Sequence, residues 1–363
     1  MNSMQKSIKF ILVILPFVFY PSIFSPYEIP KVWILVVVAI CSLLRFLYKS
    51  ERKAPANPKL LFMIAGLWGW VWISSVASGH FWESWLGNPY RSDGLLTLAS
   101  LIVLGLTFKM DKNLYRYHGW VGLLLSVLTI LTGGESPLLM GNKNFLAGYL
   151  AITLPFAIGN NIFTQGLQIL ALALLGSWGA ILTGALFMIF TYLRHYKMTL
   201  IVAAVALCLC IFFAYRVEQV ARHGEGILNA ESRERIWMKA VLAMREKPLL
   251  GWGYGQFSRA FATIDWPVHY SADVYVDRPH SSLLDYGVAG GIPAMIAYGY
   301  IAVQTSLLLL RDKSTTAKTL GMVVVLYMVQ SQTNVTSVVQ DWLFFAGVGA
   351  AIRANPQTGF DKT

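Results

Sequence analysis

Charged residues are scarce in this sequence. Asp, Glu, Lys and Arg make up 13% of the 363 residues, whereas a soluble domain of this length carries roughly 25%. Hydrophobic residues reach 56% and the mean hydropathy is +0.56. Several apolar runs approach or exceed the ~18 residues expected of a membrane-spanning helix. This composition excludes a soluble globular class and predicts an all-α, polytopic membrane protein.

Cysteine is also rare. Cys41, Cys208 and Cys210 all lie inside apolar runs. They form neither a disulfide framework nor a metal site with matching His ligands, and we interpret them as packing residues. We therefore expect neither a metal centre nor a bound cofactor.

The sequence lacks any DNA- or RNA-binding motif, although its net charge is +11. Lys and Arg cluster between the apolar runs, where they act as topology signals and contact anionic lipid headgroups. Membrane lipids are therefore expected partners, and nucleic acid is not.

The apolar runs predict about twelve transmembrane helices in a single domain that covers residues 1–363. The first run lacks a small-residue cleavage site, which favours a retained span over a removed signal peptide. The predicted spans are roughly 9–25, 31–48, 60–78, 95–108, 119–133, 145–160, 162–177, 180–193, 199–216, 281–310, 318–337 and 339–353.

Topology depends on whether residues 162–193 form one helix or two. The basic connectors are the N-terminus, "YKSERKAPANPK", "KMDKNLYRYH", "RHYK" and "RDKSTTAK". They fall on one side only if the chain turns near "GSWGA" (176–180), and the positive-inside rule favours this solution. Both termini are then cytoplasmic, and a long loop at 217–280 lies outside. A loop of this length is often functional.

Residues 232–247, "SRERIWMKAVLAMREK", predict an amphipathic helix in this loop, ended by Pro248. Steps of three and four residues place Arg233 at the head of an apolar stripe. A guanidinium on a buried edge needs a partner, either a carboxylate or a bound phosphate, which suits its planar fork. The predicted stripe continues through Trp237, Ala240, Val241 and Met244, and the predicted polar side holds Arg235, Lys239 and Glu246.

The segment "PLLGWGYGQF" that follows has three glycines but neither a preceding strand nor a Lys-Ser/Thr pair, so a tight turn against the membrane is favoured over a nucleotide site. Farther on, His280 stands at the start of an apolar helix. It is either an interfacial or capping residue or a general base, given an unperturbed pKa near 6.5. Asp285 either orients His280 or faces a lumen, and a charge within a membrane span suggests function.

Five stretches carry a family resemblance. They are "LGNPYRSDGLL" (86–96), "MGNKNFLAGYLAITLP" (140–155), "SRERIWMKAVLAMREKPLLGWGYGQF" (232–257), "RPHSSLLDYGVAGGIP" (278–293) and "QSQTNVTSVVQDWLFFAGVGA" near the end. In this order the chain resembles the O-antigen ligase/polymerase superfamily of integral-membrane glycosyltransferases. The resemblance implies a GT-C-like fold and a metal-independent, inverting transfer of a glycan from undecaprenyl pyrophosphate to an acceptor hydroxyl. The resemblance also implies that this chemistry takes place at the periplasmic face of the bacterial inner membrane.

The resemblance also implies roles for particular residues. The family's loop arginine corresponds to Arg233, which would neutralise the pyrophosphate, and its loop histidine to His280, which would activate the acceptor. Arg91 is a second candidate for phosphate contact or an interfacial anchor, and Lys143 is a candidate to contribute charge on the same face. The chain departs from relatives at two positions. Trp178 replaces the arginine of a Ser-Arg-Gly-Ala turn, a loss that Arg91, Lys143 or Arg222 would have to replace, and Ser281 replaces an asparagine.

The acceptor stays open between a lipid, a growing glycan and a protein, which correspond to an O-antigen ligase, a repeat-unit polymerase and a protein O-oligosaccharyltransferase. The alternative from another class is a transporter or flippase of lipid-linked saccharides, which should show unwound helices or polar groups near the membrane midplane. An inactive scaffold of a cell-envelope complex is a third reading, which Trp178 keeps open.

Overall fold

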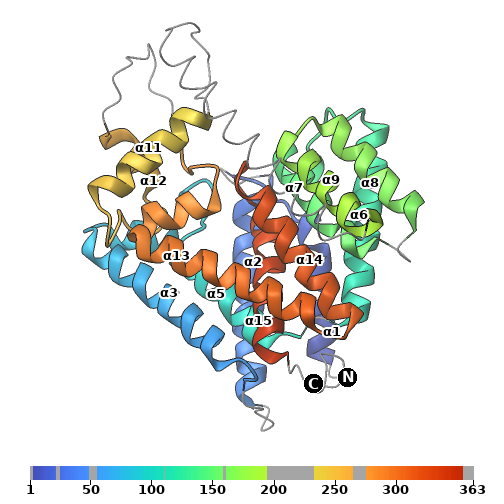
Figure 1. The fold of residues 1–363 in the computed structure, drawn as a ribbon, viewed down its shortest axis with the longest axis horizontal. Helices are drawn as coiled ribbons and strands as arrows, with labels where there is room; N and C mark the ends of the chain where they lie inside the picture. The colour runs from blue at the N-terminus through green and yellow to red at the C-terminus, as the bar shows by residue number, and fades with distance from the viewer. Residues whose placement is uncertain are drawn as a thin grey trace, which may run out of the picture.

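A computed structural model describes residues 3–21, 25–48, 55–109, 111–157, 161–193, 233–264 and 275–354. Within these residues all regular secondary structure is helical (Figure 1), which confirms the predicted all-α class. The α-helices are α1 (Ser3–Ile14), α2 (Glu28–Tyr48), α3 (Pro58–Ala77), α4 (Phe81–Leu86), α5 (Leu95–Thr107), α6 (Lys112–Leu131), α7 (Lys143–Thr153), α8 (Ile162–Leu175), α9 (Trp178–Leu193), α11 (Arg233–Glu246), α12 (Phe257–Thr263), α13 (Ser282–Arg311), α14 (Thr315–Gln330) and α15 (Val338–Arg353). Short 3₁₀ turns follow α1 (Leu15–Phe17) and α7 (Leu154–Phe156) and precede α7 (Leu138–Met140).

Several helices have the composition of membrane spans. Among the described residues, α2, α3, α6 and α13 are long and apolar enough to cross a bilayer, and α5, α8 and α9 are shorter apolar helices. Large apolar side chains such as Phe62 and Ile296 remain exposed on the bundle, at 75% and 63%. Such surface is costly in water and ordinary in lipid. The chain is an integral membrane protein, and the number of twelve spans remains a prediction.

The helices pack in three neighbouring groups (Figure 1). In the centre, α13 packs on α14, and α5 packs on both α2 and α15. On one flank α3 lies against α13, and α11 and α12 also pack against α13. On the other flank α6, α7, α8 and α9 form a group that meets α14.

Three predicted spans end well after the observed helices do, and the helix predicted at 119–133 begins earlier, at Lys112. The run at 9–25 is a helix from Ser3 to Ile14 followed by a 3₁₀ turn, because Pro16 cannot continue the hydrogen-bond ladder. The run at 145–160 changes to a 3₁₀ turn at Leu154, next to Pro155, for the same reason. The run at 318–337 ends at Gln330, which leaves the polar stretch 331–337 outside the helix.

The predicted break inside 162–193 is confirmed. Helix α8 ends at Leu175, Gly176 adopts a left-handed backbone with φ of 67°, and α9 begins at Trp178. Glycine suits this terminating position because it has no Cβ. The predicted span 199–216 and Arg222 lie outside the described residues.

The two ends of the bundle differ in character. At one end, Glu28 of α2 accepts hydrogen bonds from Ser337 and from the backbone N–H of Val338, while the Ser282 N–H donates to the Ser331 carbonyl. The starts of α2, α13 and α15 therefore meet the end of α14, and we call this the site end. The opposite end carries the described parts of the basic connectors 48–59, 109–118 and 311–318, and we call it the basic end.

Helix α13 is broken near the site end. Gly290 and Gly291 have non-helical dihedral angles, and Gly291 has a φ of 71°. The backbone N–H groups of Trp252 and Gly253 donate to the carbonyls of Val288 and Ala289, at 2.8 and 3.0 Å. Because unpaired backbone groups are costly away from water, the "PLLGWGYGQF" segment stabilises the break.

Candidate active site

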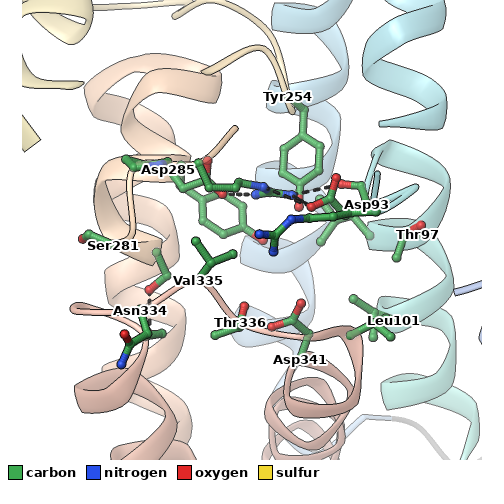
Figure 2. A pocket seen from close by; sticks show the side chains of 18 of the residues that line it. Asp93, Thr97, Leu101, Tyr254, Ser281, Asp285, Asn334, Val335, Thr336 and Asp341 are labelled. Atoms are coloured by element: carbon green, nitrogen blue, oxygen red, sulfur yellow. Dashed lines mark hydrogen bonds and ion pairs between the residues drawn. The ribbon is translucent and has the colours of Figure 1, made fainter. Parts of the chain in front are cut away.

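A cavity opens among the segments that meet at the site end. It is lined from α2, α5, α13 and α15, from the connections 87–94 and 277–281, from Tyr254, and from the polar stretch 331–337. Figure 2 shows Asp93 and Asp285 at one level, with Asp341 and Thr336 below them. The cavity volume is about 60 Å³, enough for a few water molecules. The stretch that sequence analysis had assigned to a helix therefore forms one wall of the site.

His280 lies at the edge of this cavity in an unusual backbone conformation. Its φ is 55°, in the left-handed region, which costs a non-glycine residue roughly 1–2 kcal/mol. The side chain is half-buried, and its Nδ1 atom is buried without a hydrogen-bond partner among the described residues. Strain of this kind persists only where surrounding contacts impose it, and it clusters at functional sites.

Burial, together with the positive charges of Arg233 and Arg91, lowers the pKa of His280 to about 4, against the opposing effect of Asp277. The pKa of His280 thus lies below the unperturbed value of about 6.5. The imidazole is neutral at neutral pH and can accept a proton. The same result shows that Arg233 and Arg91 lie near enough to influence His280 electrostatically.

Arg233 is the first residue of α11 and contacts the polar stretch. Its Nη2 donates to Oδ1 of Asn334 at 2.8 Å, and the Asn334 amide nitrogen lies 3.4 Å from the Ser177 hydroxyl. Asn334 itself lines the cavity. One partner of Arg233 is thus a neutral amide, whereas the sequence suggested a carboxylate or a phosphate.

Two ion pairs join the connection 87–94 to the connection 277–281, and each connection supplies one arginine and one aspartate. Nε of Arg91 lies 2.6 Å from Oδ2 of Asp277, and Nη2 of Arg278 lies 2.6 Å from Oδ2 of Asp93. Arg278 also pairs with Asp285 through Nη1, and dashed lines between Asp93 and Asp285 mark its contacts (Figure 2). Asp285 thus binds Arg278 and also lines the cavity, which agrees with the suggestion that it faces a lumen.

The charges of these two arginines are balanced differently. Burial by itself would raise the pKa of the Asp93 carboxyl, but Arg278 and Arg91 hold it below its ordinary value. Arg278 therefore lies between two carboxylates. Arg91 has one described carboxylate partner, and its Nη1 is buried with no hydrogen-bond partner in the part of the chain that the structure describes.

The helix α11 confirms the predicted amphipathic helix, but two of its residues do not lie on the faces that were predicted for them. Lys239 is buried rather than solvated, because its Nζ donates to the Phe261 carbonyl at 2.8 Å and lies 4.1 Å from the centre of the Phe261 ring. Val241, predicted on the apolar stripe, is 49% exposed, whereas Ile236 is buried. The packing of α12 against α11 accounts for this rotation of the buried face.

Of the remaining predicted residues, Ser281 lines the cavity, Lys143 and Trp178 do not, and Arg222 is outside the described chain. Lys143 pairs with Glu135 at 3.1 Å in an exposed setting and does not line the cavity. Trp178 is 81% exposed, although the preceding Ser177 contacts Asn334. Ser281 caps α13 by accepting from the Leu284 N–H. Arg222 lies outside the described residues.

Sequence reasoning did not single out Arg278 or Asn334. The stretches "NPYRSDG" and "DRPH" each contain one Arg and one Asp. This arrangement, in which each stretch could pair with the other, was the available signal for Arg278. The polar run 331–337 between two apolar helices was the signal for Asn334. Among the described residues, no group of three His, Cys, Asp or Glu side chains is arranged to hold a metal ion.

The fold defines an integral membrane protein with a cavity lined by charged residues at one end of its bundle. Residues 163–299 match the model of a protein family described as O-antigen ligase. This match confirms the predicted resemblance to the O-antigen ligase superfamily and indicates an O-antigen ligase/polymerase-like membrane enzyme. Arg233 and His280 lie inside the matched region, and Arg91 and Asn334 lie outside it. No curated protein matches the chain.

Proposed function

We propose that this protein transfers a glycan from undecaprenyl pyrophosphate to an acceptor hydroxyl, as an O-antigen ligase, a repeat-unit polymerase or a protein O-oligosaccharyltransferase. The observation that carries the proposal is the setting of His280. A strained, neutral imidazole with an unpartnered nitrogen stands at a cavity edge near two arginines, Arg233 and Arg91. This combination offers a general base beside an anion-binding pair.

In the proposed step, the acceptor hydroxyl gives its proton to His280 while its oxygen forms a bond to the anomeric carbon of the donor sugar. The bond from that carbon to the pyrophosphate oxygen breaks on the opposite face, so the configuration inverts. The departing pyrophosphate keeps the electron pair, and Arg233 and Arg91 stabilise its charge. Arginine suits this role because its planar fork binds phosphate oxygens bidentately.

Donor binding also makes His280 a stronger base. Burial is the main reason that the pKa of His280 is about 4, and the positive charges of Arg233 and Arg91 lower it further. A pyrophosphate between the two arginines offsets those charges, so the pKa of the imidazole rises toward the working pH. General bases are most effective when their pKa lies near that pH.

The site end is proposed to face the periplasm of a bacterium, with the basic end in the cytoplasm. The described basic connectors lie at the opposite end from His280, as the positive-inside rule requires for this orientation. The small cavity, about 60 Å³, suits a few waters or an acceptor hydroxyl. The sugar rings of donor and acceptor therefore bind at its mouth.

The proposal is tested with the purified chain in nanodiscs, supplied with a fluorescent undecaprenyl-pyrophosphate glycan and three acceptors: lipid A core, a second lipid-linked glycan and a hydroxyl-bearing peptide. We expect wild type to transfer to one acceptor, and His280→Gln and Arg233→Gln to lose at least about 100-fold in rate. Full transfer by both variants would refute the site assignment. Arg259→Gln, which removes an exposed ion pair with Glu83, is the matched control.

A transporter is the second candidate, and two observations favour it. Helix α13 is broken at Gly290–Gly291, and the buried polar side chains His118, Gln168 and Gln330 lie within helices of the bundle. However, the backbone groups freed by the α13 break are paired with residues 248–253, which leaves them unavailable to a solute. Movement of lipid-linked saccharide across proteoliposomes without any transfer would support the transporter.

A further inference from the structure

The ring of His280 has no described side chain that orients it. Its Nδ1 is buried without a hydrogen-bond partner among the described residues, whereas a catalytic histidine is usually oriented through the nitrogen that does not react. The direction of the ring must therefore follow from the backbone, which has a φ of 55° at this residue. Whatever fixes residues 277–281 fixes the proposed base.

The C-terminal side of this turn is tied to the end of α14. The Ser282 N–H donates to the Ser331 carbonyl at 2.8 Å, and the Ser281 hydroxyl donates to Oε1 of Gln332 at 2.9 Å. These contacts hold the first turn of α13 but lie after His280 in the chain. Before His280, Asp277 pairs with Arg91 of the connection 87–94, and Arg278 makes further contacts.

Arg278 supplies the anchor on the N-terminal side. Its Nε donates to Oδ2 of Asp93 at 3.1 Å, its Nη2 donates to the Asp93 carbonyl at 3.2 Å, and its Nη1 pairs with Asp285. The guanidinium also lies 5.7 Å from the centre of the Tyr254 ring. One side chain thus joins the turn to the connection 87–94, to α13 and to the segment after α11.

The covalent chain between Arg278 and His280 is short and stiff. Pro279 fixes its own φ and restricts the backbone of the residue before it. A displacement of Arg278 therefore also displaces His280. The two carboxylates also occupy the guanidinium of Arg278, whereas Arg91 keeps Nη1 without a described partner. Arg278 is thus suited to structural contacts rather than to a pyrophosphate.

We propose that Arg278 is a positioning residue, which holds the 277–280 turn between Asp93 and Asp285 and thereby directs the His280 imidazole into the cavity. The inference rests on the proposed function, because it assigns Arg278 to the base of that reaction. It predicts that a change at Arg278 impairs catalysis through the placement of His280 and leaves the affinity for the donor nearly intact.

Arg278→Lys is the first variant, since lysine keeps the charge but pairs with fewer of these oxygens at once. We expect kcat to fall about 10- to 100-fold, because a displacement of about 1 Å can cost that much, while KM for the donor changes less than about twofold. Arg259→Lys, in the exposed pair with Glu83, serves as the control and should keep the wild-type rate. Should Arg278→Lys fail to insert, Asp93→Asn preserves size and weakens the same anchor.

The second readout needs no glycan transfer. Diethyl pyrocarbonate modifies neutral, accessible imidazoles, so its rate at His280, followed by mass spectrometry, reports both exposure and pKa. In Arg278→Lys or Asp93→Asn we expect this rate to rise at least about threefold, and its apparent pKa to move toward the unperturbed value of about 6.5. The Arg259→Lys control should match wild type.

Unchanged kcat and unchanged modification of His280 in both anchor variants would overturn the inference. A rise in KM for the donor with kcat preserved would also overturn it, because Arg278 would then contact the donor. If the modification rate changes as expected but wild type transfers no glycan, the proposed function fails while the positioning role stands.

Discussion

The left-handed backbone of His280 predicts which of two variants, His280→Gly or His280→Ala, is the more stable. Its φ of 55° costs any residue with a Cβ roughly 1–2 kcal/mol relative to the right-handed region. Glycine avoids this cost but has greater freedom in the unfolded chain, which disfavours folding by about 0.5–1 kcal/mol. The difference leaves His280→Gly about 1 kcal/mol more stable than His280→Ala. Both variants lack the ring, so the comparison isolates the backbone.

The assay is thermal unfolding of both variants in the same nanodiscs, at the same scan rate. For a chain of this size, about 1 kcal/mol corresponds to a rise in melting temperature of roughly 1–3 °C. The control is Ser306, inside α13, where glycine should instead be less stable than alanine by about 1 kcal/mol. An alanine variant at position 280 that melts at or above the glycine variant would refute the strained backbone. Both variants should be inactive, because both lack the imidazole.

Further predictions concern charge at the site. The pKa of His280 is lowered to about 4 in the unliganded protein and should rise when a pyrophosphate offsets the charges of Arg233 and Arg91. As the pH decreases, kcat should therefore fall at a higher pH than kcat/KM does. Coincident pH profiles would contradict this. The base is active when neutral, so both rates fall as pH decreases through the relevant pKa. Arg91→Asp should lose at least about 10-fold in kcat/KM, and the exchanged pair Arg91→Asp with Asp277→Arg should not restore it; full restoration would make Arg91 only a partner of Asp277. Arg233→Lys should raise KM for the donor at least about 10-fold in steady-state kinetics, because bidentate phosphate contact is lost. Lys143→Ala, in an exposed pair, should stay within about twofold of the wild-type rate; a larger loss would make Lys143 a donor contact.

Local signals in the sequence predicted much of the helical framework. Apolar runs and terminating residues identified most of the described helices, and the positive-inside argument correctly divided α8 from α9 near Gly176. The errors occur where a proline or a polar residue lies within an apolar context. Pro16 ends the first run early, and the polar stretch 331–337 leaves its helix because it pairs with α13, α11 and α2. Such pairings depend on which segments lie next to one another in the fold. The hydrophobic periodicity of a single segment does not contain this information.

The same distinction applies to the site. The helical-face argument selected Arg233, and the position of His280 together with the family likeness selected His280. Neither could indicate that Arg278 lies between Asp93 and Asp285. Residues 93 and 278 are distant in sequence, and only the fold brings them together. Lys239 shows the converse case, since its burial follows from the packing of α12 and not from the composition of its own helix.

The most direct test of the account is inverting glycan transfer that depends on the His280 imidazole. Purified protein in nanodiscs is given undecaprenyl-pyrophosphate glycan and the preferred acceptor, and the anomeric configuration of the product is determined by NMR. The account predicts an inverted linkage, release of undecaprenyl pyrophosphate, and a loss of at least about 100-fold in His280→Gln. Undiminished transfer by His280→Gln, or a product with retained configuration, would contradict it.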